Sequence, residues 1–254
     1  MNEGISVIIR NKNEANYLSK LLKILTKHYS EDIGEIIVVD NNSTDNSLEI
    51  IKENKCKLLH IDKFTYGKAI NVGIQASSYK YCVLLSSHSL PIGNDFFINI
   101  IKSFKSFKDA AGFRFCRNKT DLDNFYNSKS AKDDANKVGL LASGCAIRKD
   151  VWEEIKFDEK LLAAEDKDWT LKILKLGMDI YLIPSFYIYV YNRNLKQEIN
   201  KYKIEKTAHY QIFNNTLNSG FLKLLKEIYR ALITFLNRLR LVFARFYIDF
   251  TFKK

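Results

Sequence analysis

A run of β-branched residues that ends in an aspartate is the feature that most constrains the fold. Residues 36–39 read Ile-Ile-Val-Val, and Asp40 follows where the apolar run stops. Such a run predicts a buried strand of a parallel sheet, and the turn after it, rich in Asn, Ser and Asp, predicts its end. In open α/β sheets ligands bind outside the carboxyl ends of the strands, so Asp40 is placed to accept hydrogen bonds from a nucleobase or ribose. The alternative is a plain strand-to-helix turn, in which Ser43 or Asp45 caps the following helix.

Strands and helices alternate along the first half of the chain. Apolar runs predict strands, and amphipathic patterns predict helices between them. The expected strands are 5–9, 35–40, 57–61 and 81–85, and the expected helices are 15–27, 43–54 and one that begins within 64–73. This alternation indicates a parallel, doubly wound α/β sheet.

The second half of the chain is less regular. We expect a helix at 96–107, strands at 111–116 and 140–148, and a polar, mobile surface stretch at 121–134. Within the strand at 140–148, Gly144 allows a ligand or a backbone to approach closely.

A histidine follows the fourth predicted strand. His88 comes directly after Ser86 and Ser87, at the same sheet edge as Asp40. We expect Pro91 to stop the chain from re-entering the sheet. The imidazole is a candidate metal ligand, and the competing interpretation is that it is structural, as a lone histidine more often is.

An acidic segment opens a later helix. Glu165, Asp166 and Asp168 precede Trp169, and the apolar face that starts there continues to Gly177, the expected C-cap. Acidic residues in the first turn favour the helix dipole, which accounts for one or two carboxylates. Three in four positions beside a tryptophan are more than a cap needs. One of them is a candidate general base, held by a helix rather than by a loop.

Length and charge limit the class of protein. With 254 residues, 46% of them hydrophobic, the chain suits one large α/β domain with an appendage. Its four cysteines lie far apart and no secretory leader precedes the first strand, which predicts a cytoplasmic protein. The formal net charge is +11, and residues 195–254 contribute +8 of it through 12 Lys and Arg against 4 Asp and Glu. We therefore predict a catalytic domain at 1–194 and a basic helical extension at 195–254.

These motifs together resemble those of the family 2 glycosyltransferases with the GT-A fold. The resemblance rests on the order and spacing of residues 6–14, residues 38–45, the segment 67–73, the strand before Pro91 and the Glu165-Asp166 pair. It implies a mostly parallel, Rossmann-like central sheet flanked by helices. It also implies an inverting transfer of a sugar from a nucleotide-diphospho-sugar to a hydroxyl of a glycan or lipid-linked glycan, in surface polysaccharide synthesis.

The resemblance also implies roles for individual residues. Asp166 matches the catalytic base and Glu165 is its acidic neighbour, while Asp168 and Trp169 are placed at the acceptor and His88 at the metal. The implied nucleotide-sugar-binding residues are Arg10, Asn11, Asn13, Glu14, Asp40, Asn42, Lys68, Asn71, Ser86 and Ser87. The backbone amides after residue 10 and the Lys68 ammonium are expected to neutralise the diphosphate.

Two positions depart from the family pattern. Relatives usually carry an Asp-x-Asp motif after the fourth strand, whose second aspartate ligates Mn²⁺ or Mg²⁺, and here these positions are Ser86 and His88. Imidazole binds Mn²⁺ well and Mg²⁺ poorly, so the expected divalent cation is Mn²⁺ rather than Mg²⁺. Many relatives also carry an arginine at the position of Ile70, and Lys68 is then the substitute charge.

The tail predicts a basic amphipathic helix over 221–254. Its charged face holds Lys223, Lys226, Glu227, Arg230, Asn237, Arg238 and Arg245, and Leu and aromatic residues cover the rest. No uncharged run reaches the ~18 residues of a membrane span. Such a helix either lies in the interface of an anionic bilayer, at the inner face of the cell membrane, or packs on the catalytic domain or on a second subunit.

Two other classes of protein compete with an active transferase. A catalytically inactive relative that binds a nucleotide sugar, or that scaffolds a synthase complex, fits the loss of Asp-x-Asp. Retention of Glu165 and Asp166 argues against it. A nucleic-acid-binding protein fits the charge but lacks a basic sheet interleaved with aromatic residues, so we expect no nucleic-acid partner.

Overall fold

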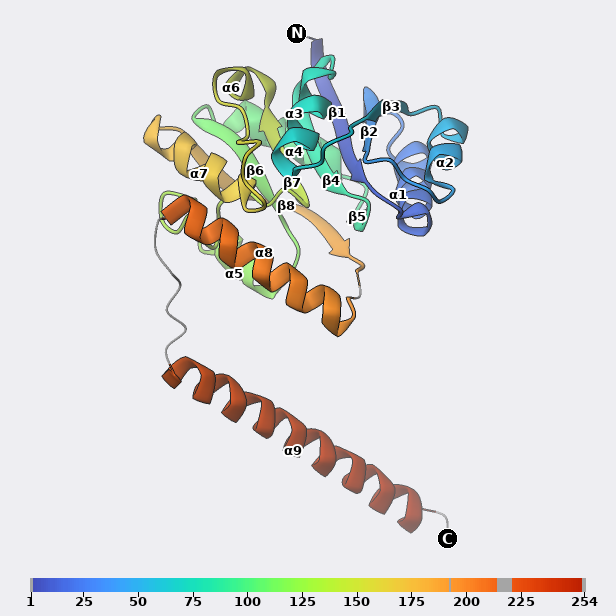
Figure 1. Cartoon of the computed structure of the whole chain (residues 1–254), viewed down its shortest axis with the longest axis vertical. Helices are drawn as coiled ribbons and strands as arrows, with labels where there is room; N and C mark the ends of the chain where they lie inside the picture. The colour runs from blue at the N-terminus through green and yellow to red at the C-terminus, as the bar shows by residue number, and fades with distance from the viewer. Residues whose placement is uncertain (1, 192, 214–220, 253–254) are drawn as a thin grey trace. The chain divides into compact units, whose positions relative to one another are not determined.

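The computed structural model describes residues 2–191, 193–213 and 221–252 (Figure 1). The chain divides into two compact units, residues 1–212 and residues 213–254. We expected the boundary after residue 194. It falls later because nearly all of helix α8 (Leu195–Phe213) belongs to the first unit.

One mostly parallel sheet forms the centre of the first unit. Eight strands among the described residues follow the order β3-β2-β1-β4-β7-β6-β8-β5. Three neighbouring pairs are antiparallel, β4 with β7, β6 with β7, and β5 with β8, and the other pairs are parallel. The strands are β1 (Asn2–Asn11), β2 (Glu35–Asp40), β3 (Lys57–His60), β4 (Tyr79–Ser86), β5 (Ser89–Ile92), β6 (Ala110–Cys116), β7 (Gly144–Arg148) and β8 (Asp179–Tyr189). The α/β class that the alternating pattern predicts is confirmed.

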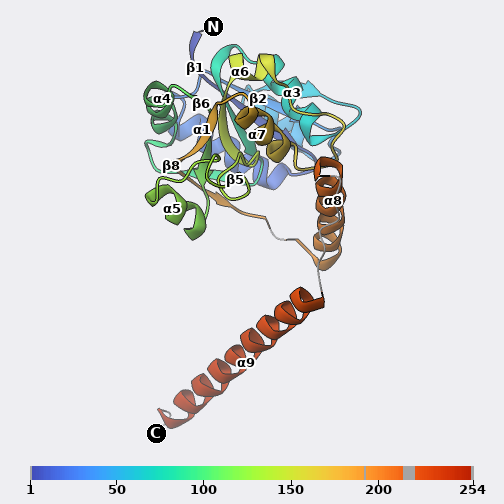
Figure 2. The same ribbon diagram turned by 90° about the vertical axis from the view of Figure 1, so that its left-hand side faces the viewer.

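Helices cover both faces of this sheet, with α3 and α4 on opposite sides in Figure 2. Side chains alternate along β1, so Val7 and Ile9 pack with α1 and α4 while Ile8 packs with α3 and α7. The helices of the first unit before α8 are α1 (Ala15–His28), α2 (Ser47–Glu53), α3 (Tyr66–Gln75), α4 (Phe96–Ser106), α5 (Lys119–Tyr126), α6 (Lys149–Glu154) and α7 (Glu165–Lys175).

Pro91 does not keep the chain out of the sheet, which corrects our expectation. It lies inside β5, whose register places it opposite Tyr187 of β8. Because β5 is the last strand of the sheet, a proline there costs no ladder bond on its open side. The partner strand β8 was not expected from the sequence at all.

The stretch 121–134 is also more ordered than its polar composition suggests. It contains most of α5, and Asp121 in it is 1% exposed because it accepts two hydrogen bonds from Arg114. The polar composition of this stretch therefore did not reveal helix α5, whose first turn is held by the ion pair between Asp121 and Arg114.

Two predicted elements are shorter than expected because their first residues bond elsewhere. Helix α2 begins at Ser47 rather than at Ser43, since the Ser43 amide and hydroxyl both donate to Asp40. Strand β7 begins at Gly144 rather than at residue 140, since the backbone amides of Leu140 and Ala142 donate to side chains of α7.

The second unit consists of the helix α9 (Phe221–Thr251), as the tail pattern predicts. From residue 224 to residue 251 every side chain is exposed, including its leucines and phenylalanines. Within the part of the chain that the structure describes, no helix combines the length and the hydropathy that a membrane crossing requires.

Candidate active site

An open cavity of about 700 Å³ lies in the first unit, where β1 and β4 end. Its wall comes from the loops after these two strands, from the segment before β7, from the start of α7, and from the end of β8 with α8. The site therefore opens at the carboxyl edge of the parallel strands, where α/β folds bind their ligands.

The acidic pair stands on one side of this cavity. Glu165 and Asp166 open α7, directly after Ala164, which adopts the left-handed conformation with φ 61°. The Asp166 carboxylate accepts hydrogen bonds from the backbone amides of Ala142 at 2.9 Å and Lys167 at 2.8 Å. The positive-φ residue and these two amides fix where the carboxylate lies.

Glu165 has a different environment from its neighbour. Its side chain is 6% exposed and its Oε1 accepts from Arg10 at 3.2 Å. Burial, followed by the charge of Asp166, raises the pKa of Glu165 from 4.5 to about 7, and the Arg10 guanidinium opposes this rise. Burial beside a second carboxylate therefore favours the protonated form of Glu165.

His88 also lines the cavity, inside a cage of tyrosines. Its ring centroid is 4.8 Å from Tyr17, 5.8 Å from Tyr189 and 4.2 Å from Tyr191. Burial, and then the charge of Arg193, lowers the pKa of His88 to about 4. The imidazole is thus neutral at pH 7, so its 3.6 Å approach to the Glu14 carboxylate is not an ion pair at that pH.

The structure brings eight of the predicted site residues into the cavity wall. They come from three separate segments of the chain: the end of β1 with the loop after it, the end of β4 with the turn after it, and the start of α7. They are Arg10, Asn11, Glu14, Ser86, Ser87, His88, Glu165 and Asp166.

Asp40 lies behind the wall rather than in it. Its side chain is fully buried, with Oδ1 accepting from Asn11 at 2.9 Å and from the Ser43 hydroxyl at 2.6 Å. Its Oδ2 accepts from the Ser43 amide at 2.8 Å. In this structure Asp40 therefore holds together the loops after β1 and β2 from within. Asn13, whose Oδ1 accepts from Thr44, belongs to the same loop junction, and the exposed Asn42 lies next to it.

Four more predicted site residues are not among those that line the cavity. Asn71 of α3 is 6% exposed and joins Trp152 to the backbone of Phe157. Lys68 also belongs to α3 and is not part of the cavity wall. Trp169 is fully buried and stacks on Phe157.

Asp168 pairs with Lys172 one turn further along α7 at 2.6 Å. An i, i+4 pair of this kind supports a helix locally. The departure at Ile70 has a related explanation, because this side chain is fully buried in the core on the α3 face.

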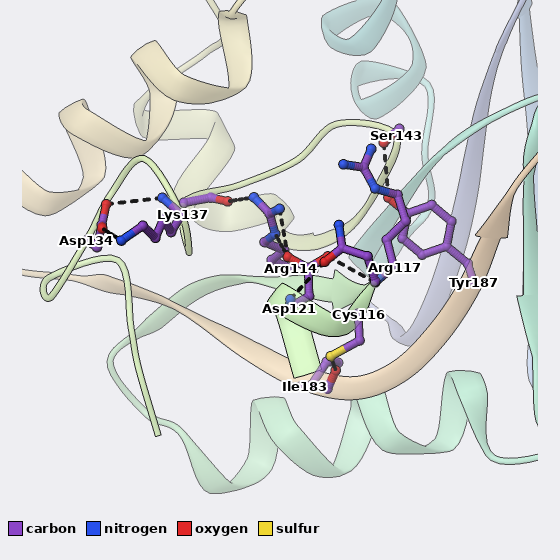
Figure 3. Close-up of polar contacts among 11 residues, drawn as sticks. Arg114, Cys116, Arg117, Asp121, Asp134, Lys137, Ser143, Ile183 and Tyr187 are labelled. Carbon is purple, nitrogen blue, oxygen red and sulfur yellow. Dashed lines mark hydrogen bonds and ion pairs between the residues drawn. The ribbon is translucent and has the colours of Figure 1, made fainter. Parts of the chain in front are cut away.

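Sequence reasoning missed the cations at the far end of the cavity. Arg117 follows β6 and Arg193 follows β8, and both line the cavity over tyrosine rings. Asp121 accepts from the Arg117 amide at 3.0 Å and from Arg114 at 2.8 Å, as Figure 3 shows. The Arg114 ion pair therefore neutralises Asp121 and leaves the Arg117 side chain facing the cavity. The tyrosines before residue 193, among them Tyr189 and Tyr191, were the sequence signal that could have pointed to these arginines.

Sheet order, cavity position and acidic pair together define a glycosyltransferase with the GT-A fold. The chain belongs to glycosyl transferase family 2, because the model of that family matches residues 6–163.

Individual relatives agree with this assignment. The chain is 26% identical, over 80% of its own length and 72% of the relative's, to a dolichyl N-acetyl-glucosaminyl phosphate diacetamido-dideoxy-glucuronosyltransferase of Methanococcus voltae. It spans 32% or less of three further curated glycosyltransferases.

Two solved structures share the fold of the first unit. The mannosyltransferase PcManGT of Pyrobaculum calidifontis, solved with GDP-Man and Mn²⁺, superposes with TM-score 0.67 at 15% identity, over 85% of this chain and 65% of that one. Glucosyl-3-phosphoglycerate synthase of Mycobacterium tuberculosis, solved with Mn²⁺ and UDP, gives TM-score 0.63 at 12% identity, over 83% and 80%.

The residues at His88 fit a divalent cation only in part. Its Nδ1 is buried and makes no hydrogen bond to any described residue, and the Glu14 carboxylate is the nearest acidic partner of the ring. Imidazole with carboxylate is a donor set that Mn²⁺ accepts. Among the described residues, however, no group of three His, Cys, Asp or Glu side chains converges on one point. A cation held here would take its other ligands from the substrate diphosphate.

Proposed function

We propose that the protein transfers a sugar, with inversion, from a nucleotide-diphospho-sugar to a hydroxyl group of a glycan or lipid-linked glycan. The observation that carries this proposal is the position of Asp166. It lines the cavity at the start of α7, oriented by two backbone amides. A carboxylate held in this way is a suitable general base for a hydroxyl group.

The reaction needs a base on one side of the anomeric carbon and charge neutralisation on the other. Asp166 accepts the proton of the acceptor hydroxyl while the oxygen of that hydroxyl bonds to the anomeric carbon. The bond from the anomeric carbon to the diphosphate oxygen breaks at the same time. The nucleoside diphosphate then leaves with both electrons of that bond. A single displacement of this kind inverts the anomeric centre.

Cations in the cavity wall support the second requirement. Arg117, Arg193 and Lys12 all line the wall, and no described carboxylate is paired with Arg117 or Lys12. They are placed to bind the diphosphate charge. When bound, a divalent cation would neutralise part of the same charge, and His88 with Glu14 would hold it.

The nucleoside is assigned to the end of the cavity where the loops after β1 and β2 meet. Asn11 and Asn41 line this end, and Phe64 and Tyr66 add two half-exposed rings. Polar groups beside aromatic rings suit a base and a ribose. Asp40 supports this end from behind through its bonds to Asn11 and Ser43.

The second unit supports a lipid-linked acceptor. Along α9 the exposed apolar side chains are joined by cationic ones, among them Lys226, Arg230 and Arg238. An amphipathic helix of this composition binds the surface of an anionic bilayer. We assign α9 to the inner face of the cell membrane, which places the enzyme beside an acceptor of surface polysaccharide synthesis. Self-association through α9 is the competing assignment.

A donor screen tests the proposal. Purified protein is incubated with UDP-, GDP- and dTDP-linked sugars, with and without Mn²⁺, and release of the nucleoside diphosphate is measured. We expect one donor class to turn over in the wild type and not in Asp166→Asn. Binding of a nucleotide sugar without turnover in any condition would instead identify an inactive, scaffolding relative.

A further inference from the structure

Arg10 was expected at the nucleotide, yet its polar atoms bond to protein groups beside the proposed base. Its Nη1 donates to the Glu165 carboxylate at 3.2 Å and its Nη2 donates to the Ala142 carbonyl at 3.0 Å. The guanidinium lies 5.3 Å from the centre of the Tyr66 ring, and the side chain is 13% exposed. Both terminal nitrogens of the Arg10 guanidinium therefore donate a hydrogen bond to a protein acceptor.

The peptide group of Ala142 extends this contact to the base. Its carbonyl accepts from Arg10, and its amide donates to Asp166 Oδ2 at 2.9 Å. One arginine of β1 thus bonds Glu165 directly and reaches Asp166 through a single residue. Three parts of the chain meet here: the end of β1, the segment before β7 and the first turn of α7.

We propose that Arg10 is a positioning residue for the catalytic base, and not a nucleotide-binding residue. This inference rests on the proposed function, because it assigns Asp166 the role of base. The guanidinium holds Ala142 and the start of α7 at a fixed distance, so the Asp166 carboxylate stays where the acceptor hydroxyl has to be.

Charge explains why a cation is needed at this point. Glu165 is 5% exposed and adjoins a second carboxylate, so its ionised form requires a buried partner. The groups that face it are Arg10 from β1, Asp166 from its own helix and the thiol of Cys145 from β7. Arg10 is the cation among them. Lysine would supply the charge but not the planar fork that reaches two acceptors.

Kinetics separate the two roles of Arg10. We expect Arg10→Gln to lower kcat about 100-fold, as a base displaced by about 1 Å would. The KM for the donor, and the Kd of UDP or GDP by calorimetry, should stay within threefold of wild type. Arg10→Lys should likewise keep nucleotide binding and the folded state, and it should not restore kcat. A rise of tenfold or more in the nucleotide Kd with kcat preserved would overturn the proposal.

A matched control tests whether loss of any arginine–carboxylate pair has this effect. Arg148 of β7 pairs with Asp150, outside the cavity wall. Arg148→Gln removes the same charge and should leave kcat within twofold. An equal loss of kcat in this variant would overturn the specific role of Arg10.

The ionisation of Glu165 gives a readout that needs no substrate. In protein labelled at its glutamate carboxyl carbons, NMR follows the titration of Glu165, assigned with Glu165→Gln. Arg10→Gln should shift this titration to higher pH, because the opposing cation is lost, and Arg10→Lys should shift it less. An unchanged titration would refute the contact. A wild type that turns over no donor, with the titration shifted as expected, would refute the proposed function and leave the Arg10 contact established.

Discussion

The two units of the chain use their apolar residues in opposite ways. In the first unit, leucines of α1 such as Leu18 and Leu21 are fully buried, and their burial holds the sheet edge on which the cavity is built. In α9, Leu232 is 54% exposed and Phe243 is 68% exposed. Burying such side chains stabilises by roughly 1.5–3 kcal/mol each, so α9 exposes surface that a partner can cover. The comparison therefore separates a unit that buries its apolar residues around the cavity from a helix that leaves them exposed, and it is the basis of our proposal that α9 serves for attachment.

The largest effect that separates the units is expected from Asp166→Asn. The amide keeps the shape of the carboxylate and loses its basicity, so transfer should fall by roughly 10²–10⁴-fold. Nucleotide affinity and vesicle binding should both stay at the wild-type level. Transfer assays and vesicle co-sedimentation on one preparation check this, and wild-type turnover would remove Asp166 from the mechanism.

The reciprocal experiment changes only the second unit. The triple substitution Lys226→Glu, Arg230→Glu and Arg238→Glu reverses three cations that each contribute about 1 kcal/mol near an anionic surface. Vesicles rich in phosphatidylserine should then bind at least about 100-fold more weakly, while donor hydrolysis should not change.

A matched variant controls for this charge reversal. The control reverses three exposed lysines of the first unit, Lys119→Glu, Lys129→Glu and Lys160→Glu. The protein with these three substitutions should still bind vesicles. Sedimentation in low and high salt provides the readout, since the electrostatic part is screened by salt. Vesicle binding that is absent in the wild type, with a dimer that the triple substitution dissociates, would support self-association instead.

A smaller effect is expected from Asp40→Ala. The substitution removes the acceptor of three hydrogen bonds and leaves the Asn11 amide only its longer 3.2 Å bond to the Ser43 hydroxyl. We expect the free energy of unfolding of the first unit to fall by about 1–3 kcal/mol and nucleotide binding to weaken by a comparable amount. Urea denaturation and calorimetry with UDP or GDP measure the two quantities. A loss of affinity with unchanged stability would place the carboxylate in direct contact with the ligand.

The smallest effect is a dependence of stability on pH that belongs to the first unit alone. His88 has a pKa of about 4 in the folded protein against an ordinary 6.5, so its contribution to stability is lost as the pH falls from 6.5 to 4. Glu165 has a pKa of about 7 against 4.5, so its contribution is lost as the pH rises from 4.5 to 7. Melting temperatures of His88→Gln and Glu165→Gln, each compared with wild type across this range, should therefore differ with opposite slopes. Parallel slopes would contradict the two assignments.

Local pattern was sufficient for the elements that carry the motifs. The run before Asp40 forms β2, and the acidic segment opens α7, because in both places sequence periodicity and tertiary burial agree. It failed where a long-range contact decides the outcome. Pro91 is tolerated because it pairs with a distant strand at the sheet edge, and Asp121 is buried because Arg114 neutralises it.

The candidate site shows the same division. Asp166, Glu165 and His88 lie at strand or helix ends, and those positions are readable from the sequence. Asn71 and Trp169 have the residue types of a binding site but are used inside the core, through Trp152 and Phe157. Arg193 could not be placed beforehand, because its position depends on β8, whose outward and inward residues do not alternate cleanly.

The short strand β5 also has a consequence for how copies of this chain can meet. Sheet edges are templates onto which strands of other chains add, and proteins block them with short strands and proline. At this end of the sheet the edge is four residues long and contains Pro91, which has no amide hydrogen to donate. Strand addition is therefore disfavoured here. Any assembly that involves this edge has to form through side chains, and single substitutions can then strengthen or weaken it.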